Sequence, residues 1–157
     1  HIRVREDSSW DVPEPELTLA INAGGEIFGF TVGNDVSSRS IAGENPLYLP
    51  QAKVYRGSCA LGPSLLLGRD SISQRAFIEL KIFRNDQLVF EGETDLTQLK
   101  RRFEELVEFL YRELDFAHGA MLMTGHGVVP GSDFTLSSGD RVEITIEGVG
   151  TLTNHVA

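Results

Sequence analysis

Apolar side chains recur at every second residue in several segments of this chain, but at helical spacing in only one. Residues 77–84 and 142–147 alternate apolar with polar or charged side chains, which is typical of strands with one buried face. Residues 17–22 and 26–32 are separated by a glycine pair and predict a β-hairpin, and residues 120–123 predict a further strand. The helices needed to connect parallel strands are missing, so we expect an α+β, mainly β domain.

One segment has the periodicity of an amphipathic helix, and its charged residues lie on the opposite face. Thr94 or Asp95 can cap this helix, because their side-chain oxygens accept hydrogen bonds from the first backbone N–H groups. We therefore expect one long helix that begins after Thr94 or Asp95 and ends at about Leu114. Its apolar positions are Leu99, Phe103, Leu106, Leu110 and Leu114.

Length and composition exclude several classes of protein. The 157 residues favour a single domain over residues 1–157. A net charge of −9 argues against nucleic-acid binding, since such proteins usually carry a basic patch. No apolar run approaches the roughly 20 residues that a membrane-spanning helix needs. Cys59 is the single cysteine, which excludes an intrachain disulfide and favours a reducing compartment, so we expect a cytoplasmic protein.

Two carboxylates precede the predicted hairpin in the run P-E-P-E-L. On an extended segment Glu14 and Glu16 point to the same side, where their charges repel unless a cation compensates them. Hard divalent cations such as Mg²⁺ prefer oxygen ligands of this kind. A solvated acidic strand entry is the alternative, because this spacing is common.

Asp35 lies in G-N-D-V-S-S-R, at the end of the second strand of the hairpin. An antiparallel return brings this residue back beside Glu14 and Glu16, which predicts a site of three carboxylates. Capping of a short following helix is the alternative role for Asp35, and the spacing alone leaves both roles open.

Several motifs resemble the fumarylacetoacetate hydrolase family. They extend from about Val12 to Val156 and are most similar to the branch that acts on 2-keto-3-deoxy sugar acids. The resemblance implies a mixed β-roll or sandwich of packed sheets, assembled as a homodimer or a larger homo-oligomer. The motifs are V-P-E-P-E-L, G-N-D-V-S-S-R, G-E-N-P-L-Y-L-P-Q-A-K-V-Y, C-A-L-G-P, T-G-H-G-V-V-P and F-T-L-S-S-G-D-R-V-E-I.

The same resemblance implies roles for four residues of the site. Glu14, Glu16 and Asp35 match the family's metal ligands, and the metal is usually Mg²⁺, with Mn²⁺ or Ca²⁺ also compatible. Lys53, in P-Q-A-K, matches an active-site lysine that faces the substrate beside the metal. A lysine at the surface without a role is the alternative.

Other positions are implied to contact the substrate, namely Ser38, Arg39 and Thr124. His126 stands where the family usually has a second threonine, and its imidazole can hydrogen-bond the substrate or act in acid–base catalysis. A histidine without such a role is an equal alternative. Ala42 stands where relatives often have Gln or Glu, which bears on hydrolytic water activation and on the choice of substrate.

These features lead to two hypotheses about function. The first is a metal-dependent enzyme acting on a small 2-keto or diketo acid through a metal-stabilised enolate. Dehydration of a 2-keto-3-deoxy sugar acid is favoured slightly over hydrolytic C–C cleavage. The alternative is a catalytically incomplete family domain that serves as a binding or assembly module. It is motivated by His126, by Ala42 and by the short segment before Glu14, since the resemblance implies an upstream N-terminal segment with further catalytic groups.

Overall fold

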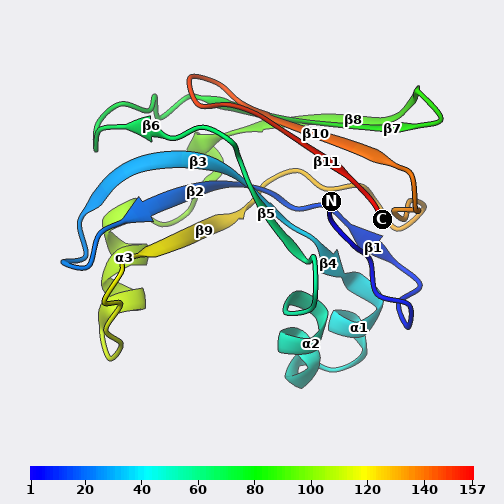
Figure 1. The fold of residues 1–157 in the computed structure, drawn as a ribbon, viewed down its shortest axis with the longest axis horizontal. Coiled ribbons are helices and arrows are strands. Elements are labelled where there is room, and N and C mark those ends of the chain that lie inside the picture. Colours follow the sequence, from blue (N-terminus) through cyan, green and yellow to red (C-terminus); the bar gives the residue numbers. More distant parts are fainter.

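In the computed structural model, which describes residues 1–157, two antiparallel sheets pack face to face, and the α-helices lie beside one of them (Figure 1). One sheet has the order β11-β10-β7-β8 and the other β5-β3-β2-β9, with β6 also paired to β3 and a small β1–β4 sheet at one end. This architecture confirms the predicted α+β, mainly β class. In chain order the elements are β1 (Asp11–Val12), β2 (Pro15–Ile21), β3 (Ile27–Asp35), β4 (Ser37–Ser38), α1 (Arg39–Glu44), η1 (Pro46–Tyr48), α2 (Leu49–Lys53), β5 (Cys59–Leu61), β6 (Leu66–Leu67), β7 (Phe77–Arg84), β8 (Gln87–Asp95), η2 (Leu96–Gln98), α3 (Phe103–Tyr111), β9 (Ala120–His126), β10 (Arg141–Ile146) and β11 (Gly150–His155).

The core fills the space between the two sheets. Alternate residues of each strand point inward, so the apolar rows of β7, β10 and β2 form much of one cluster of 21 buried residues. Burial of each such side chain stabilises the fold by roughly 1.5–3 kcal/mol. The three rows contribute Ile78, Leu80, Ile82, Val142, Ile144, Ile146, Leu17, Leu19 and Ile21.

The predicted hairpin of residues 17–22 and 26–32 is confirmed, and a second hairpin follows further along the chain. β2 pairs with β3, and Glu16 lies opposite Gly33. β7 pairs with β8 through a turn in which Asn85 and Asp86 have φ angles of 51° and 61°. Two successive left-handed residues are typical of the type I′ turn, whose twist matches that of the strands it joins.

The prediction of one long helix after Thr94 or Asp95 is wrong. Both residues belong to β8, where they pair with Ile78 and Phe77 of β7. The Asp95 carboxylate does act as a cap, but of the short η2, and the chain is extended again at Leu99. The α3 helix has only nine residues and ends at Tyr111. Pairing within the β7–β8 hairpin therefore continues to Asp95, and the extended backbone at Leu99 separates η2 from α3.

The irregular segment between β3 and β5 folds into short helices below the five-stranded sheet (Figure 1). Ser38 caps α1, and α2 ends at Lys53, so this segment presents side chains to the ends of β2 and β3. None of the helices is both long enough and apolar enough to cross a membrane. Ile2 and Val156 form a parallel bridge, which places the two chain ends side by side.

An ion pair between the partly exposed Arg84 and the buried Asp140 fixes the loop before β10 to the end of β7. Arg84 donates two hydrogen bonds to Asp140, at 2.8 and 2.7 Å, and a third to the carbonyl of Thr135 at 2.9 Å. The Asp140 side chain is fully buried, and its carboxylate also accepts a bond from the backbone N–H of Ser137. Loss of Arg84 would therefore leave a buried charge without its cation.

We expect Arg84→Met to lower the free energy of unfolding by about 3 kcal/mol, because the fully buried Asp140 carboxylate would lose its cation. Urea denaturation followed by circular dichroism measures this change. Arg69→Met is the matched control, because its pair with Glu104 is exposed on both sides and should matter little. Equal losses in the two variants would contradict the assigned role of Arg84.

Candidate active site

Three carboxylates converge at the ends of β2 and β3, as the sequence predicts. Glu14 directly precedes β2 and Glu16 lies within it, so both side chains point away from the core. Asp35 ends β3, and its backbone N–H donates to the carbonyl of Glu14 at 3.0 Å. One ligand oxygen from each of the three residues lies within 4.8 Å of the others.

Burial makes this cluster electrostatically costly. Glu14 and Glu16 are 3% and 4% exposed, and Asp35 is partly buried. Burial raises the pKa of Glu16 to about 7, although a hydrogen bond of 2.6 Å from the backbone N–H of Gly125 acts in the opposite direction. Burial also raises the pKa of Asp35. Like charges held out of water in this way require a cation.

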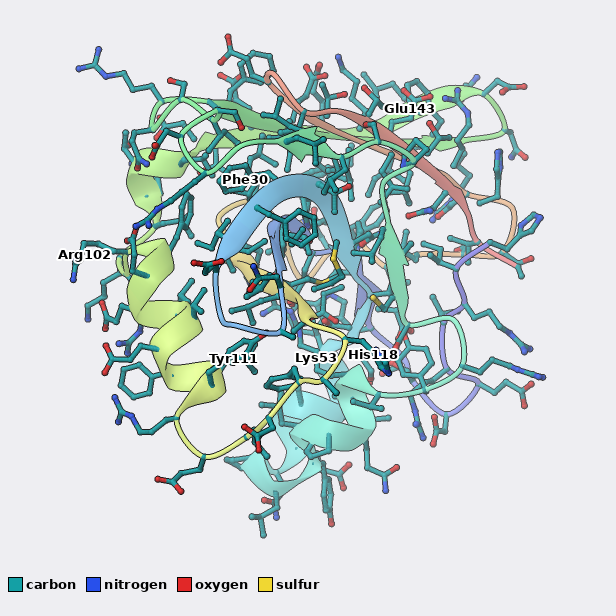
Figure 2. The ribbon with its side chains drawn as sticks, turned by 60° about the vertical axis from the view of Figure 1, so that its left-hand side comes forward. Phe30, Lys53, Arg102, Tyr111, His118 and Glu143 are labelled. Atoms are coloured by element: carbon teal, nitrogen blue, oxygen red, sulfur yellow. The ribbon has the colours of Figure 1, made fainter.

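Lys53 supplies a cation from the end of α2. Its Nζ contacts Oε2 of Glu14 and lies 2.5 Å from Oδ2 of Asp35. Burial lowers the pKa of Lys53, but the hydrogen bonds to Asp35 and Glu14 outweigh this effect, so the pKa is raised overall. Figure 2 shows Lys53 just above the short helices, on the side of the five-stranded sheet that faces away from the other sheet. The ammonium therefore occupies the position where a cation is needed.

Arg39 and His126 meet on the other side of Glu14. Arg39 begins α1, and its Nη2 lies 3.0 Å from Oε1 of Glu14. His126 ends β9 opposite Glu16, with its Nε2 at 3.5 Å from the same Oε1 and 3.4 Å from Nη2 of Arg39. Burial lowers the pKa of His126, although the charge of Glu14 raises it. The structure thus brings Lys53, Arg39 and His126 together around one carboxylate.

The hydroxyls of Ser38 and Thr124 are engaged in the scaffold. Ser38 is fully buried, and its Oγ accepts a hydrogen bond from the N–H of Ile41 at 3.3 Å. Thr124 donates to the carbonyl of Leu17 at 2.9 Å. The structure places both residues beside the cluster, and their contact with a substrate stays a prediction.

One contributor to the site has no side chain and was not found from the sequence. The N–H of Gly125 reaches Glu16 because Gly125 adopts a φ of +103°, in the region that favours glycine. The glycines of T-G-H-G were the only available signal, and they do not indicate which backbone group points at which carboxylate.

The donor set suits a hard divalent cation. Three carboxylate oxygens provide the ligands that Mg²⁺, Mn²⁺ and Ca²⁺ prefer, whereas zinc sites usually contain cysteine or several histidines. Lys53 already stands as a cation between Glu14 and Asp35. The residues present therefore fit a bound metal ion of this class.

Comparison with known proteins agrees with this geometry. Residues 18–157 match the family model described as fumarylacetoacetate (FAA) hydrolase C-terminal. The chain is 47% identical over 156 residues to a probable 2-keto-3-deoxyxylonate dehydratase of Haloferax volcanii, covering 99% of this chain and 54% of the relative. It is 42% identical over 156 residues to a 2-dehydro-3-deoxy-D-arabinonate dehydratase of Saccharolobus solfataricus, covering 99% and 52%.

A solved structure is also similar. It is 2-keto-3-deoxy-D-arabinonate dehydratase complexed with magnesium and 2,5-dioxopentanoate, with a TM-score of 0.94, 43% identity, and coverage of 99% of this chain and 56% of that chain. The chain spans about half the length of the curated relatives it matches. With its motifs, its packed sheets and its carboxylate cluster, the chain belongs to the fumarylacetoacetate hydrolase family and corresponds to the family's C-terminal domain.

Proposed function

We propose that this chain forms the metal-holding catalytic part of an enzyme that dehydrates a 2-keto-3-deoxy sugar acid. The observation that carries the proposal is the buried cluster of Glu14, Glu16 and Asp35 with Lys53 seated beside it. Two relatives at 47% and 42% identity are dehydratases of such acids, which supports dehydration over hydrolytic C–C cleavage.

We infer that Glu14, Glu16 and Asp35 hold Mg²⁺, with Mn²⁺ or Ca²⁺ as substitutes. The similar structure at 43% identity contains magnesium and 2,5-dioxopentanoate, a keto acid, which supports this assignment. Bound to the cluster, Mg²⁺ would stabilise the negative charge that develops on the keto oxygen of a 2-keto acid.

Dehydration of such an acid removes a proton from the carbon beside the keto group and hydroxide from the next carbon. The overall loss is one water molecule, and a double bond forms between these carbons. The Lys53 ammonium is a donor only, so we assign it proton transfer to the leaving hydroxide. His126 reaches the same cluster from β9, and we assign its Nε2 the acceptance of the carbon-bound proton. Proton exchange with solvent restores both groups.

We assign Arg39 to the substrate carboxylate. Its Nη2 is paired with Glu14, but the Arg39 side chain is still 30% exposed, so further N–H groups of the guanidinium can face a ligand. A free donor on a guanidinium suits a carboxylate, which such groups bind through parallel hydrogen bonds. We assign Ser38, at the start of α1, and Thr124, in β9, to contact with a substrate hydroxyl.

We expect Mg²⁺ to bind wild-type protein and Asp35→Asn to weaken binding by more than roughly 100-fold. Loss of a residue that only hydrogen-bonds a metal ligand lowers metal affinity by about 10–100-fold, and loss of a direct ligand lowers it further. Calorimetric titration of metal-free protein measures the dissociation constant. Asp115→Asn, an exposed aspartate outside the cluster, is the control and should leave it unchanged. Equal affinities in wild type and Asp35→Asn would refute the metal assignment.

We expect Mg²⁺-loaded protein to convert a 2-keto-3-deoxy pentonic acid into a dehydrated keto acid, detected by mass spectrometry as loss of one water. Lys53→Met should lower kcat by roughly 10²–10⁴-fold, the usual contribution of a positioned proton donor. Lys81→Met is the control, because Lys81 pairs with Glu79 and Glu91 on an exposed strand face. Mg²⁺ binding without any turnover would instead favour the binding or assembly module.

We further propose that the chain assembles with copies of itself. Several large apolar side chains of the segment 47–54 are exposed together, including Leu47 at 82%, Leu49 at 51% and Val54 at 78%. Exposed apolar surface of this kind often marks an interface between proteins. Sedimentation velocity is expected to give at least twice the 17.3 kDa mass of one chain, and a single-chain mass at micromolar concentration would contradict assembly.

A further inference from the structure

A hydrogen bond between two buried amide side chains joins the two sheets close to the carboxylate cluster. Nδ2 of Asn34 donates to Oδ1 of Asn154 at 3.0 Å. Asn34 belongs to β3 of the five-stranded sheet and is 0% exposed, whereas Asn154 belongs to β11 of the other sheet and is 6% exposed. The two residues are 120 positions apart in the chain, so this bond is a tertiary contact.

The bond stands where apolar residues would serve the core better. Phe30 and Val32 are the preceding inward side chains of β3, and Leu152 is the preceding inward side chain of β11. Oδ1 of Asn34 is buried and has no partner, and an orphaned buried acceptor costs free energy. The pair is therefore poorly explained by its contribution to stability alone.

The position of Asn34 in the strand gives a different explanation. Neighbouring residues of a strand point to opposite faces, so Asn34 points into the core while Asp35 points to the carboxylate cluster. A fixed Asn34 amide also fixes the peptide that carries Asp35. The orientation of the Asn154 amide is itself set, because its Nδ2 donates to the carbonyl of Thr153 at 3.3 Å.

We propose that Asn34 and Asn154 form a positioning pair, through which β11 holds the carboxylate of Asp35 at its place in the metal site. This inference rests on the proposed function, because it assumes that the cluster binds Mg²⁺. Asn34 and Asn154 act through Asp35, because their amides hydrogen-bond each other and the backbone rather than a carboxylate of the cluster.

The test is the Mg²⁺ affinity of Asn154→Val, measured by calorimetry on metal-free protein. Valine suits a strand and removes the acceptor without opening a large cavity. We expect the dissociation constant to rise at least about tenfold, the lower end of the effect of outer partners on metal sites. If this variant does not fold, Asn154→Ala takes its place. Asn154→Asp keeps an oxygen at the acceptor position and should bind Mg²⁺ at least as tightly as wild type.

Leu152→Ala is the matched control, because Leu152 lies on the same strand and the same inward row. It should lower the melting temperature by creating a cavity, yet leave the dissociation constant within about threefold of wild type. An unchanged affinity in Asn154→Val, or an equal loss in Leu152→Ala, would overturn the positioning role. Failure of wild type to bind Mg²⁺ would refute the proposed function and this inference together. Mg²⁺ binding by wild type with an unchanged affinity in Asn154→Val would refute this inference alone.

Discussion

The mutual repulsion of three carboxylates, two buried and one partly buried, is the constraint around which this end of the molecule is organised. Glu14, Glu16 and Asp35 sit within a few ångströms of one another and largely out of water. In a medium of low dielectric constant, such charges cannot remain close unless cations or N–H donors face them. The helices after β3 provide Arg39 and Lys53, and a glycine in β9 provides a backbone N–H.

One face of the β2–β3 hairpin contributes to the core, and the other carries the residues of the site. The inward row is apolar and joins the core, whereas the outward row at the strand ends carries the acids. The hairpin therefore gains from the core the stability that holds its charged end together. Rigid strands also keep the oxygens in fixed relation, which a metal site requires more than a loop can provide.

Features of the fold and of the site could be predicted from the sequence where they depend on contacts between residues close together in the chain. The β2–β3 hairpin, and with it the approach of Asp35 to Glu14 and Glu16, follows from the strand patterns and one glycine turn. The prediction of a long helix failed because the ladder between β7 and β8 continues to Asp95 and the chain is extended again at Leu99, neither of which the helical spacing of apolar residues reports. The Arg39–Glu14 pair and the Asn34–Asn154 bond were not predicted, since both depend on how separate elements pack. Lys53 was placed by family resemblance rather than by any periodicity.

Charge balance also constrains how Lys53 and a metal ion share the site. Three carboxylates facing Lys53 and Arg39 leave one formal negative charge uncompensated. The ammonium lies on Oε2 of Glu14 and Oδ2 of Asp35, and these two carboxylates belong to the cluster that would hold a metal ion. A divalent cation on those oxygens reverses the sign of the balance and repels the ammonium at short range. Under the proposed function, Lys53 would then turn from the carboxylates toward the bound 2-keto acid, which carries the opposite charge.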